Sequence, residues 1–203
     1  VYNVQPDESL QVEGEIRLLG RVAIGLTARA FYSPVEQVNY ELIRLLANNG
    51  KITDSSVGDF ERGSRVVKDV TVPIKFSVTD VGLRTSAGIG FPLLRDDVIT
   101  KLLSETKERI SDVYLETPGI TDSAVELRGV RRVGSENMDC DLSNEFVHLK
   151  RTVKDIKSGV SIVDRLEIRK SMIPNEAMMT QAFSSFQDET RRCFGRAAVI
   201  IKR

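Results

Sequence analysis

The sequence predicts an α+β fold, with a curved, mainly antiparallel sheet and about three helices in a single compact domain. Long segments alternate between apolar and polar residues, which predicts strands with one face in the core and the other in water. Other segments repeat apolar residues at three- and four-residue spacing between capping and stop signals, which predicts helices. No internal repeat or flexible linker divides the 203 residues, so we expect one domain over residues 1–203.

The first predicted element is a long strand. From Val12 to Ala30 every second residue is small or apolar, a period that places one face of a strand in the core. Gly14, Gly20 and Gly25 fall inside this run and predict bends that let the strand curl. Residues 1–9, which precede it, are expected to form a flexible arm.

A helix over residues 33–49 follows. Ser33 at the N-cap, Pro34 at the first helical position and Glu36 three residues after the cap form a capping box. Asn48-Asn49-Gly50 supplies the stop. The polar residues 51–64 predict a mobile loop.

The middle of the sequence predicts a second long strand and a second helix. Residues 66–79 alternate again, and Pro73 within them predicts a sheet edge because proline cannot donate to a ladder. Residues 83–92 are rich in glycine but lack the other residues of a phosphate loop, which favours a turn between a strand and a helix. A helix is then expected from Asp96 to Tyr114.

The last eighty residues predict three further strands, a helix and a final strand. The strands are expected at residues 124–133, 146–153 and 160–170. A terminal helix begins near Pro174 and is stopped by Gly195, and residues 197–201 predict a short buried strand. The helix is expected to bury one apolar face: Met179, Ala182, Phe183, Phe186 and Cys193.

The residues that usually carry catalysis are scarce, so we expect a protein that is not an enzyme and has no cofactor. His148 is the single histidine, and its place in an alternating run favours a partly exposed strand residue over a catalytic base. Cys140 and Cys193 are too few for a disulfide scaffold or a metal site, and predict a reducing, intracellular compartment. Cys193 is expected to fill a gap next to Phe194.

The net charge is zero, but it is unevenly placed. Residues 150–203 hold 12 basic and 6 acidic residues, a balance of +6, and the rest of the chain carries −6. This balance predicts a surface for an anionic partner. The alternative is that these basic side chains only form a solvent-exposed face and bind no partner. The candidate residues are Arg165, Arg169, Lys170, Arg191, Arg192, Arg196, Lys202 and Arg203.

A second candidate surface is expected around the predicted mobile loop. Lys51, Asp54 and Asp59 lie in this loop, and Pro73 marks the predicted sheet edge. Unpaired strand edges and loops beside them can pair with another copy of the same chain. We therefore expect these residues to take part in self-association.

Three segments give the chain a resemblance to a known family. They are a long strand from Gly20 to Tyr32 that runs directly into the helix over residues 33–49, the strand Ser161-Ile162-Val163-Asp164, and the terminal helix with Phe183-Ser184-Ser185-Phe186 followed by Phe194-Gly195. In these the chain resembles the matrix proteins of rhabdoviruses, with those of plant-infecting viruses among the candidates.

The resemblance implies a structural protein of the virion without a cofactor. Such a protein self-associates, condenses the nucleocapsid and links it to an anionic membrane and the glycoprotein tail during assembly and budding. It is implied to occur in the virion and in the host cytoplasm, associated with membrane, or in the nucleus.

Two other classes of function stay open. One is a plant-virus movement protein with non-specific nucleic-acid binding, which would have more strands and fewer long helices. The other is a small-ligand-binding domain, with a cavity under the strand predicted from Val12 to Ala30.

Overall fold

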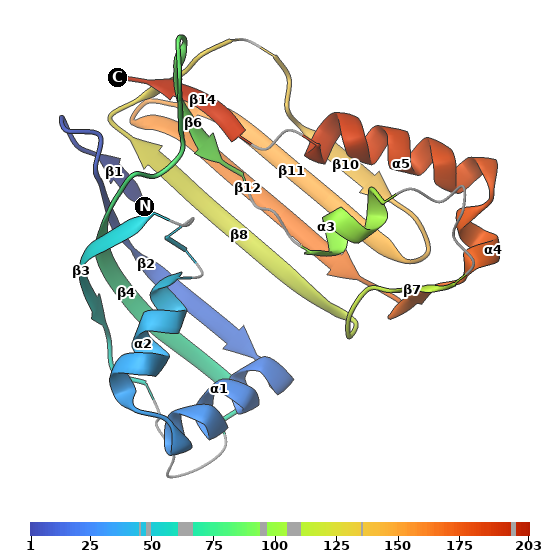
Figure 1. Cartoon of the computed structure of the whole chain (residues 1–203), viewed down its shortest axis with the longest axis horizontal. Coiled ribbons are helices and arrows are strands. Elements are labelled where there is room, and N and C mark those ends of the chain that lie inside the picture. The colour runs from blue at the N-terminus through green and yellow to red at the C-terminus, as the bar shows by residue number, and fades with distance from the viewer. Residues whose placement is uncertain are drawn as a thin grey trace. The chain divides into compact units, whose positions relative to one another are not determined.

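The computed structural model describes residues 1–44, 46–47, 50–60, 67–93, 97–104, 111–134, 136–195 and 198–203. Within them the fold is α+β and mostly strands, which confirms the predicted class (Figure 1). The chain divides into two compact units rather than the single domain expected. Unit 1 is Val1–Leu83 with Leu127–Gly129, and unit 2 is Arg84–Glu126 with Val130–Arg203.

Unit 1 is built on strands β1 (Tyr2–Val4), β2 (Leu10–Leu19), β3 (Lys51–Val57) and β4 (Asp69–Thr79). β4 pairs with β2 on one side and β3 on the other, and both pairings are antiparallel. The predicted alternation of β4 is confirmed, because its buried residues fall at every second position: Val70, Val72, Ile74, Phe76 and Val78.

The strand predicted from Val12 to Ala30 is wrong in its second half. β2 ends at Leu19, and Gly20–Tyr32 form helix α1. Gly20 adopts a φ of 58°, a left-handed conformation that glycine favours and that turns the chain out of the strand. The buried residues of α1 are Ala23, Thr27 and Ala30, a four- and three-residue spacing typical of a helix.

Two segments expected to be flexible contain strands instead. In the predicted arm 1–9, β1 pairs with β2 and, in parallel, with the end of strand β8, and Tyr2 and Val4 are buried. In the predicted loop 51–64, residues 51–57 form β3, with residues 61–64 outside the described part of the chain. Both segments form strands because a neighbouring strand satisfies their backbone groups, which the local sequence does not reveal.

The predicted helix over residues 33–49 is present as α2 (Val35–Arg44), with Val38, Leu42 and Ile43 buried. Ser33 also ends the preceding helix, since its backbone N–H donates to the Arg29 carbonyl. Of the predicted stop, Asn48 and Asn49 lie outside the described residues, and the Gly50 N–H donates to the Ala47 carbonyl at 2.8 Å.

Pro73 is not on an edge strand, because β4 has a neighbour on both sides. The β3 ladder, however, ends at the pair Val57–Ile74, just before Pro73 is reached. The N–H of Gly58 donates to the Pro73 carbonyl at 2.7 Å. In an antiparallel sheet the backbone nitrogen and the carbonyl of one residue point to the same neighbouring strand, so the Pro73 nitrogen faces β3, as its carbonyl does. Because the β3 ladder has already ended at this point, the N–H that proline lacks removes no hydrogen bond from the sheet.

The sheet of unit 2 contains β8 (Gly119–Arg128), β10 (Cys140–Ser143), β11 (Val147–Ile156) and β12 (Gly159–Ile168). β11 and β12 form an antiparallel hairpin paired along its whole length, from Val147–Ile168 to Ile156–Gly159. The strand order is β10-β11-β12-β8, and the sheet continues through β8 to β1, β2, β4 and β3. The parallel β1–β8 pairing makes this sheet mixed rather than purely antiparallel.

Shorter strands complete unit 2. β6 (Gly88–Pro92) and β9 (Arg131–Arg132) pair with the C-terminal strand β14 (Ala198–Lys202), which confirms the predicted final strand. The glycine-rich residues 83–92, expected as a turn before a helix, form strands β5 (Leu83–Thr85) and β6. β7 (Val113–Tyr114) pairs with β13 (Met172–Ile173).

The helices of unit 2 are shorter than predicted. Of the helix expected from Asp96 to Tyr114, residues Asp97–Leu102 form α3, residues 113–114 belong to β7, and residues 96 and 105–110 lie outside the described part. The terminal helix is divided into α4 (Asn175–Met178) and α5 (Gln181–Phe194). Thr180 caps α5, since its hydroxyl accepts from the Phe183 N–H at 3.2 Å.

This division changes the predicted apolar face. Phe183 and Phe186 are buried as expected, but Met179 is 50% exposed and Ala182 is exposed as well. The remaining buried positions of α5 include Gln187 and Thr190. The buried face of α5 therefore begins after its N-cap Thr180, whereas Met179 is the C-cap of α4 and is not part of this face.

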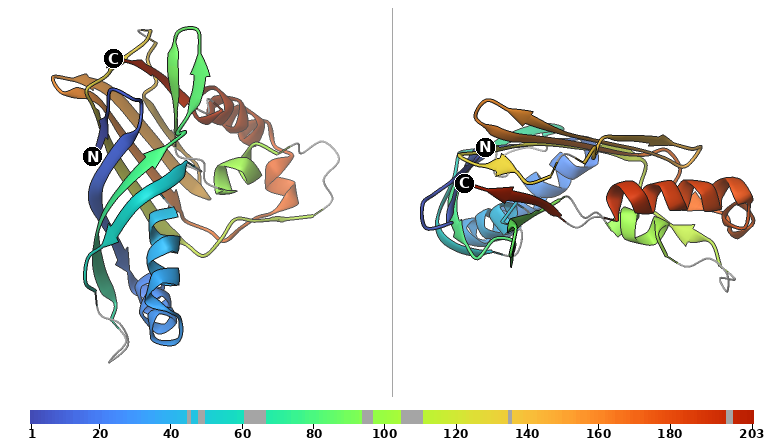
Figure 2. Two further views of the ribbon diagram at one scale, coloured as in Figure 1. Left: turned by 60° about the vertical axis from the view of Figure 1, so that its left-hand side comes forward. Right: turned by 90° about the horizontal axis from the view of Figure 1, so that it is seen from above.

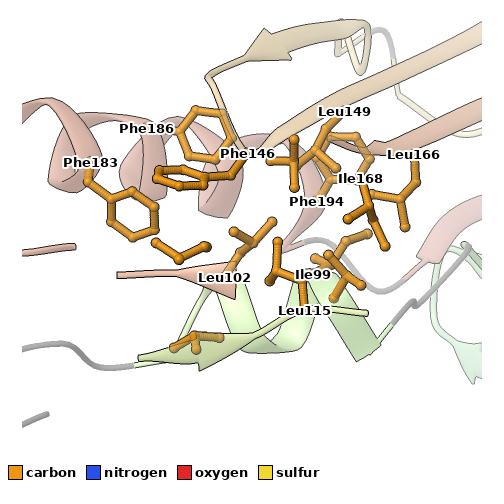
Figure 3. Close-up of a cluster of buried hydrophobic side chains, with 14 of the residues drawn as sticks. Ile99, Leu102, Leu115, Phe146, Leu149, Leu166, Ile168, Phe183, Phe186 and Phe194 are labelled. Atoms are coloured by element: carbon orange, nitrogen blue, oxygen red, sulfur yellow. The ribbon is translucent and has the colours of Figure 1, made fainter. Parts of the chain in front are cut away.

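Helix α5 covers one face of β10, β11 and β12 (Figure 2). Between helix and sheet lies a cluster of buried side chains that gathers residues from seven elements (Figure 3). Its members include Ile99, Leu102, Leu115, Phe146, Leu149, Leu166, Ile168, Phe183, Phe186 and Phe194. This cluster is the core of unit 2.

We predict that Phe183→Ala lowers the free energy of unfolding by about 3–5 kcal/mol, because it opens a cavity in this core. Phe186→Ala should have a similar effect. Chemical denaturation would measure both. Met179→Ala is the matched control from the same region, and it should be nearly neutral because half of this side chain is exposed. Equal effects of Phe183→Ala and Met179→Ala would contradict the assignment.

Candidate interaction surfaces

The most constrained polar group of unit 2 is a buried ion pair between neighbouring strands. Arg151 and Asp164 are directly opposite in the β11–β12 hairpin, and both point into the core face. Arg151 Nε is 2.6 Å from Asp164 Oδ1, and Nη2 is 3.2 Å from Oδ2. The Arg151 guanidinium also lies 4.5 Å from the centre of the Phe194 ring. The pair therefore receives a two-point salt bridge and an aromatic cover from α5.

The two cysteines form a disulfide, contrary to the prediction that they are free thiols. Cys140 in β10 and Cys193 in α5 are bonded, with their Cα atoms 6.0 Å apart. Sequence analysis missed this pair because 53 residues separate the two positions and only the fold brings them together. The expectation of a reducing compartment, which rested on free cysteines, loses its basis. A cavity of about 250 Å³ borders the disulfide and is lined by Asp139 and Arg192 among others.

The opposite face of the same strands carries a ladder of charged side chains. His148 Nε2 is 2.7 Å from Asp141 Oδ1, and Lys150 Nζ is 2.9 Å from Asp141 Oδ2. The hydrogen bond from His148, followed by that from Lys150, lowers the pKa of the Asp141 carboxyl. His148 Nδ1 lies 3.5 Å from Glu167. The predicted partly exposed strand histidine is confirmed, since 22% of the His148 side chain is exposed, and its ring contacts two carboxylates.

No group of three or more metal-ligating side chains in the described part of the chain is arranged to hold a metal ion.

Half of the predicted anionic-partner residues are engaged with acidic side chains. Arg165 pairs with Asp122 at 3.3 Å, Lys170 pairs with Glu145, and Arg191 pairs with Asp188 at 2.8 Å. Arg169 lies 3.7 Å from Glu167 and donates to the Asn144 carbonyl at 2.7 Å. The +6 balance of this part of the sequence is therefore reduced locally by ion pairs.

The remaining predicted cations do not gather on one surface. Arg192, Lys202 and Arg203 are exposed and make no ion pair with any residue that the structure describes, and Arg196 lies outside that part. Arg165 points to the face of the sheet opposite the core, whereas Arg192 is on α5, which covers the core face. The structure thus separates residues that the sequence placed together.

The predicted self-association residues lie along one sheet edge. β3 is the terminal strand in the order of the sheet, and Lys51 and Asp54 on it are exposed. Asp59 follows β3 and is exposed, and Pro73 is exposed on β4 beside Gly58. The edge predicted at Pro73 is therefore one strand away, at β3.

Sequence analysis missed a group of exposed hydrophobic residues in unit 1. It is formed by the exposed hydrophobic residues of α1, α2 and the residue before α1, which we call the α1–α2 apolar surface. Tyr32 is 83% exposed, Val22 62% and Phe31 60%. The other members are Leu19, Val35 and Tyr40. Recognising α1 as a helix would have revealed this surface, because its buried face needs only Ala23, Thr27 and Ala30.

Unit 2 has a groove of about 500 Å³ between the β10–β11 turn and helices α4 and α5. Its lining is mainly apolar with two carboxylates: Asn144, Glu145, Phe146, Glu176, Ala177 and Phe183 take part. Asn144 fixes the turn, because its side-chain oxygen accepts from the N–H groups of Phe146 and Val147. We call this the α4–α5 groove.

Comparison with known proteins identifies no relative: no family model, curated protein or solved structure matches the chain. Among the described residues, no helix combines the length and apolar character needed to span a membrane. The rhabdovirus resemblance therefore rests on the sequence features given above.

We predict that Arg151→Met costs about 3–5 kcal/mol of folding free energy, because it leaves the Asp164 carboxylate buried without its partner. The double variant Arg151→Met with Asp164→Leu should recover most of this loss, since neither charge remains. Urea unfolding of the wild type, both single variants and the double variant would measure the coupling. Additive losses would contradict a direct pair.

The disulfide should stabilise the fold by about 4 kcal/mol, from the entropy of closing a loop of this length in the unfolded chain. Reduction should therefore lower the melting temperature of the wild type. The double variant Cys140→Ser with Cys193→Ser should have the melting temperature of the reduced wild type, whether or not reductant is present. Two titratable thiols in unreduced, native protein would contradict the bond.

Proposed function

We propose that this chain is a non-enzymatic structural protein of the matrix type, which acts by self-association and by linking other components of a virion. The observation that carries the proposal is the α1–α2 apolar surface, with Tyr32, Val22 and Phe31 each at least 60% exposed. Large exposed apolar groups on one pair of helices are typical of interaction sites. Of the three sequence features that resemble rhabdovirus matrix proteins, the strand before the terminal helix and the phenylalanines of that helix support the same class, whereas the segment Gly20–Tyr32 is a helix and not the expected strand.

The composition of α1 favours a docking helix over a solvated one. Its exposed positions include Val22, Gly25, Arg29 and Tyr32, which follow one another at three- and four-residue spacing. Val22 and Tyr32 are the apolar side chains of this face, and each would contribute about 1.5–3 kcal/mol when a partner buries it.

The charged residues suit the other partners of the proposed function. α1 contains Arg21 and Arg29 and no acidic residue, which favours contact with an anionic membrane surface. Arg192, Lys202 and Arg203 are the predicted cations left for a nucleocapsid, since the other described ones are paired. The glycoprotein tail completes the set of partners, and the proposed sites are the virion and host membranes, cytoplasm or nucleus.

We predict that the protein forms larger species as its concentration rises, and that Val22→Ser with Tyr32→Ser weakens this association at least about tenfold. Sedimentation velocity over a concentration series would measure it. Tyr114→Ser is the matched control, because this tyrosine is 60% exposed in unit 2. A wild-type protein that stays monomeric at every concentration would overturn the proposed function.

A further inference from the structure

The disulfide between β10 and α5 borders a small cavity whose lining carries two opposite charges. We propose that this cavity is a site for a small amino-acid thiol, of which cysteine is the simplest, and that the bound thiol exchanges with the Cys140–Cys193 bond. The inference goes beyond the proposed function and does not depend on it, because it concerns a covalent site of unit 2 alone.

The cavity gives the disulfide access from outside the core. Cys140 and Cys193 are each partly buried: they pack against the core cluster of unit 2, and they also line the cavity of about 250 Å³. This volume lies below the roughly 300–1,000 Å³ of sites for drug-sized ligands. The space therefore suits a molecule of a few heavy atoms, such as a single amino acid.

Two charged side chains line the same cavity without pairing. Asp139 and Arg192 are both exposed, and within the described chain neither forms an ion pair with the other or with a third residue. One oxygen of Asp139 accepts from the Val153 N–H at 2.9 Å, which holds the carboxylate beside the sheet. A cation and an anion that share a cavity without contact fit a ligand that carries both charges.

The segment that carries Asp139 is fixed by its own hydrogen bonds. Arg132 Nη1 donates to the Glu136 carbonyl at 2.8 Å, and the Asn137 side-chain oxygen accepts from the Asp139 N–H at 2.9 Å. Asn137 is part of the cavity lining, and its amide nitrogen has no acceptor among the described residues, so it is available to a carboxylate. Polar groups that are already in place lower the entropic cost of binding a small ligand.

The ligand that matches this lining is a zwitterion with a thiol. Its carboxylate pairs with Arg192 and its ammonium group pairs with Asp139. Each of these charged residues directly precedes one of the cysteines, so a ligand held by both charges has its thiol beside the bond. An amino acid without sulfur would use the charges only, and an uncharged thiol would use the bond only.

The exchange is a balanced reaction in two steps. The ligand thiolate attacks Cys140 Sγ and forms a new S–S bond, while the bond to Cys193 breaks and its electron pair leaves on Cys193 Sγ. Arg192 stabilises this leaving thiolate, whereas the charges of Asp139 and Asp141 disfavour a thiolate at the position between them. A second thiolate then attacks the sulfur of the bound ligand, expels the Cys140 thiolate and releases the oxidised dimer. The two ligand thiols thus supply two electrons, and their two protons end on the protein thiols.

The core of unit 2 has other anchors that remain while the bond opens. β10 is the terminal strand in the order of the sheet, and none of its four residues is fully buried. Helix α5 is held in the core by Phe183, Phe186 and Phe194. Exchange is therefore a reaction of the folded protein, and it loosens β10 first.

The test compares four small thiols on the folded protein with its disulfide intact. Cysteine carries both charges, mercaptopropionate only the carboxylate, cysteamine only the ammonium group, and mercaptoethanol neither. The opening rate is measured by acid quench, alkylation and mass spectrometry, and is divided by the rate of the same thiol with a small uncharged disulfide. We define the selectivity for a thiol as this normalised rate relative to that of mercaptoethanol with the same protein. The selectivity for cysteine should be about tenfold and should exceed that for either singly charged thiol.

Charge-neutral variants assign the two contacts. Arg192→Gln should lower the selectivity for cysteine and mercaptopropionate about three- to fivefold and should not lower that for cysteamine. Asp139→Asn keeps an oxygen for the Val153 N–H, and it should lower the selectivity for cysteine and cysteamine but not for mercaptopropionate. Arg191→Gln is the matched control and should behave like the wild type, because Arg191 pairs with Asp188 at 2.8 Å and does not line the cavity.

Unfolding and adduct mapping complete the test. In urea-unfolded protein the selectivity should disappear, because the cavity is lost. The first adduct should be found on Cys140, with the released Cys193 thiolate trapped by alkylation. Equal normalised rates for all four thiols with the folded wild type, or a bond that opens only after unfolding, would overturn the site. Equal loss of selectivity in Arg191→Gln and Arg192→Gln, or a first adduct on Cys193, would also overturn it. None of these results bears on self-association, so their failure leaves the proposed function untouched.

Discussion

The salt bridge between Arg151 and Asp164 is the constraint on which the arrangement of unit 2 depends. Two charges on the core face of a hairpin are costly unless each is fully engaged. The register of β11 against β12 brings them opposite each other, and a shift of one residue would separate them. Phe194 covers the guanidinium from the end of α5. One polar pair therefore contacts both strands of the hairpin and the helix that covers them.

The other contacts of α5 follow from that placement. With Phe194 above the ion pair, the preceding turns direct Phe186 and Phe183 toward Phe146, and Cys193 reaches Cys140 on β10. Gln187 donates to the Leu102 carbonyl at 2.7 Å, which ties the same helix to the end of α3. The α4–α5 groove lies at the start of this helix, where Thr180 is among its lining residues. A candidate binding surface thus arises from the same geometry that builds the core.

The elements predicted correctly from the sequence are those whose own residues alternate between apolar and polar with a regular period. β4, β11, β12, α2 and β14 were found because each has a clear apolar pattern. The segment after Leu19 was misread, because small residues such as Ala23 and Gly25 fit a strand and a helix equally well. β1 is three residues long and β3 is mostly polar, so neither shows an apolar pattern of its own, and both are defined by the strands they pair with. The Cys140–Cys193 bond joins positions 53 residues apart. The interaction surfaces were missed for the same reason: once α1 was taken as a strand, the exposure of Phe31 and Tyr32 could not be seen.

The disulfide has a mechanical consequence. It closes a covalent ring from Cys140 to Cys193 that encloses the whole β11–β12 hairpin, α4 and most of α5. Tension applied through the two ends of the chain passes across this bond and not through the hairpin. Strand β14, which follows the ring, can peel away from β6 and β9 while the salt bridge stays unloaded. An assembly that pulls on its subunits would extend the segments outside the ring first and leave the α4–α5 groove intact.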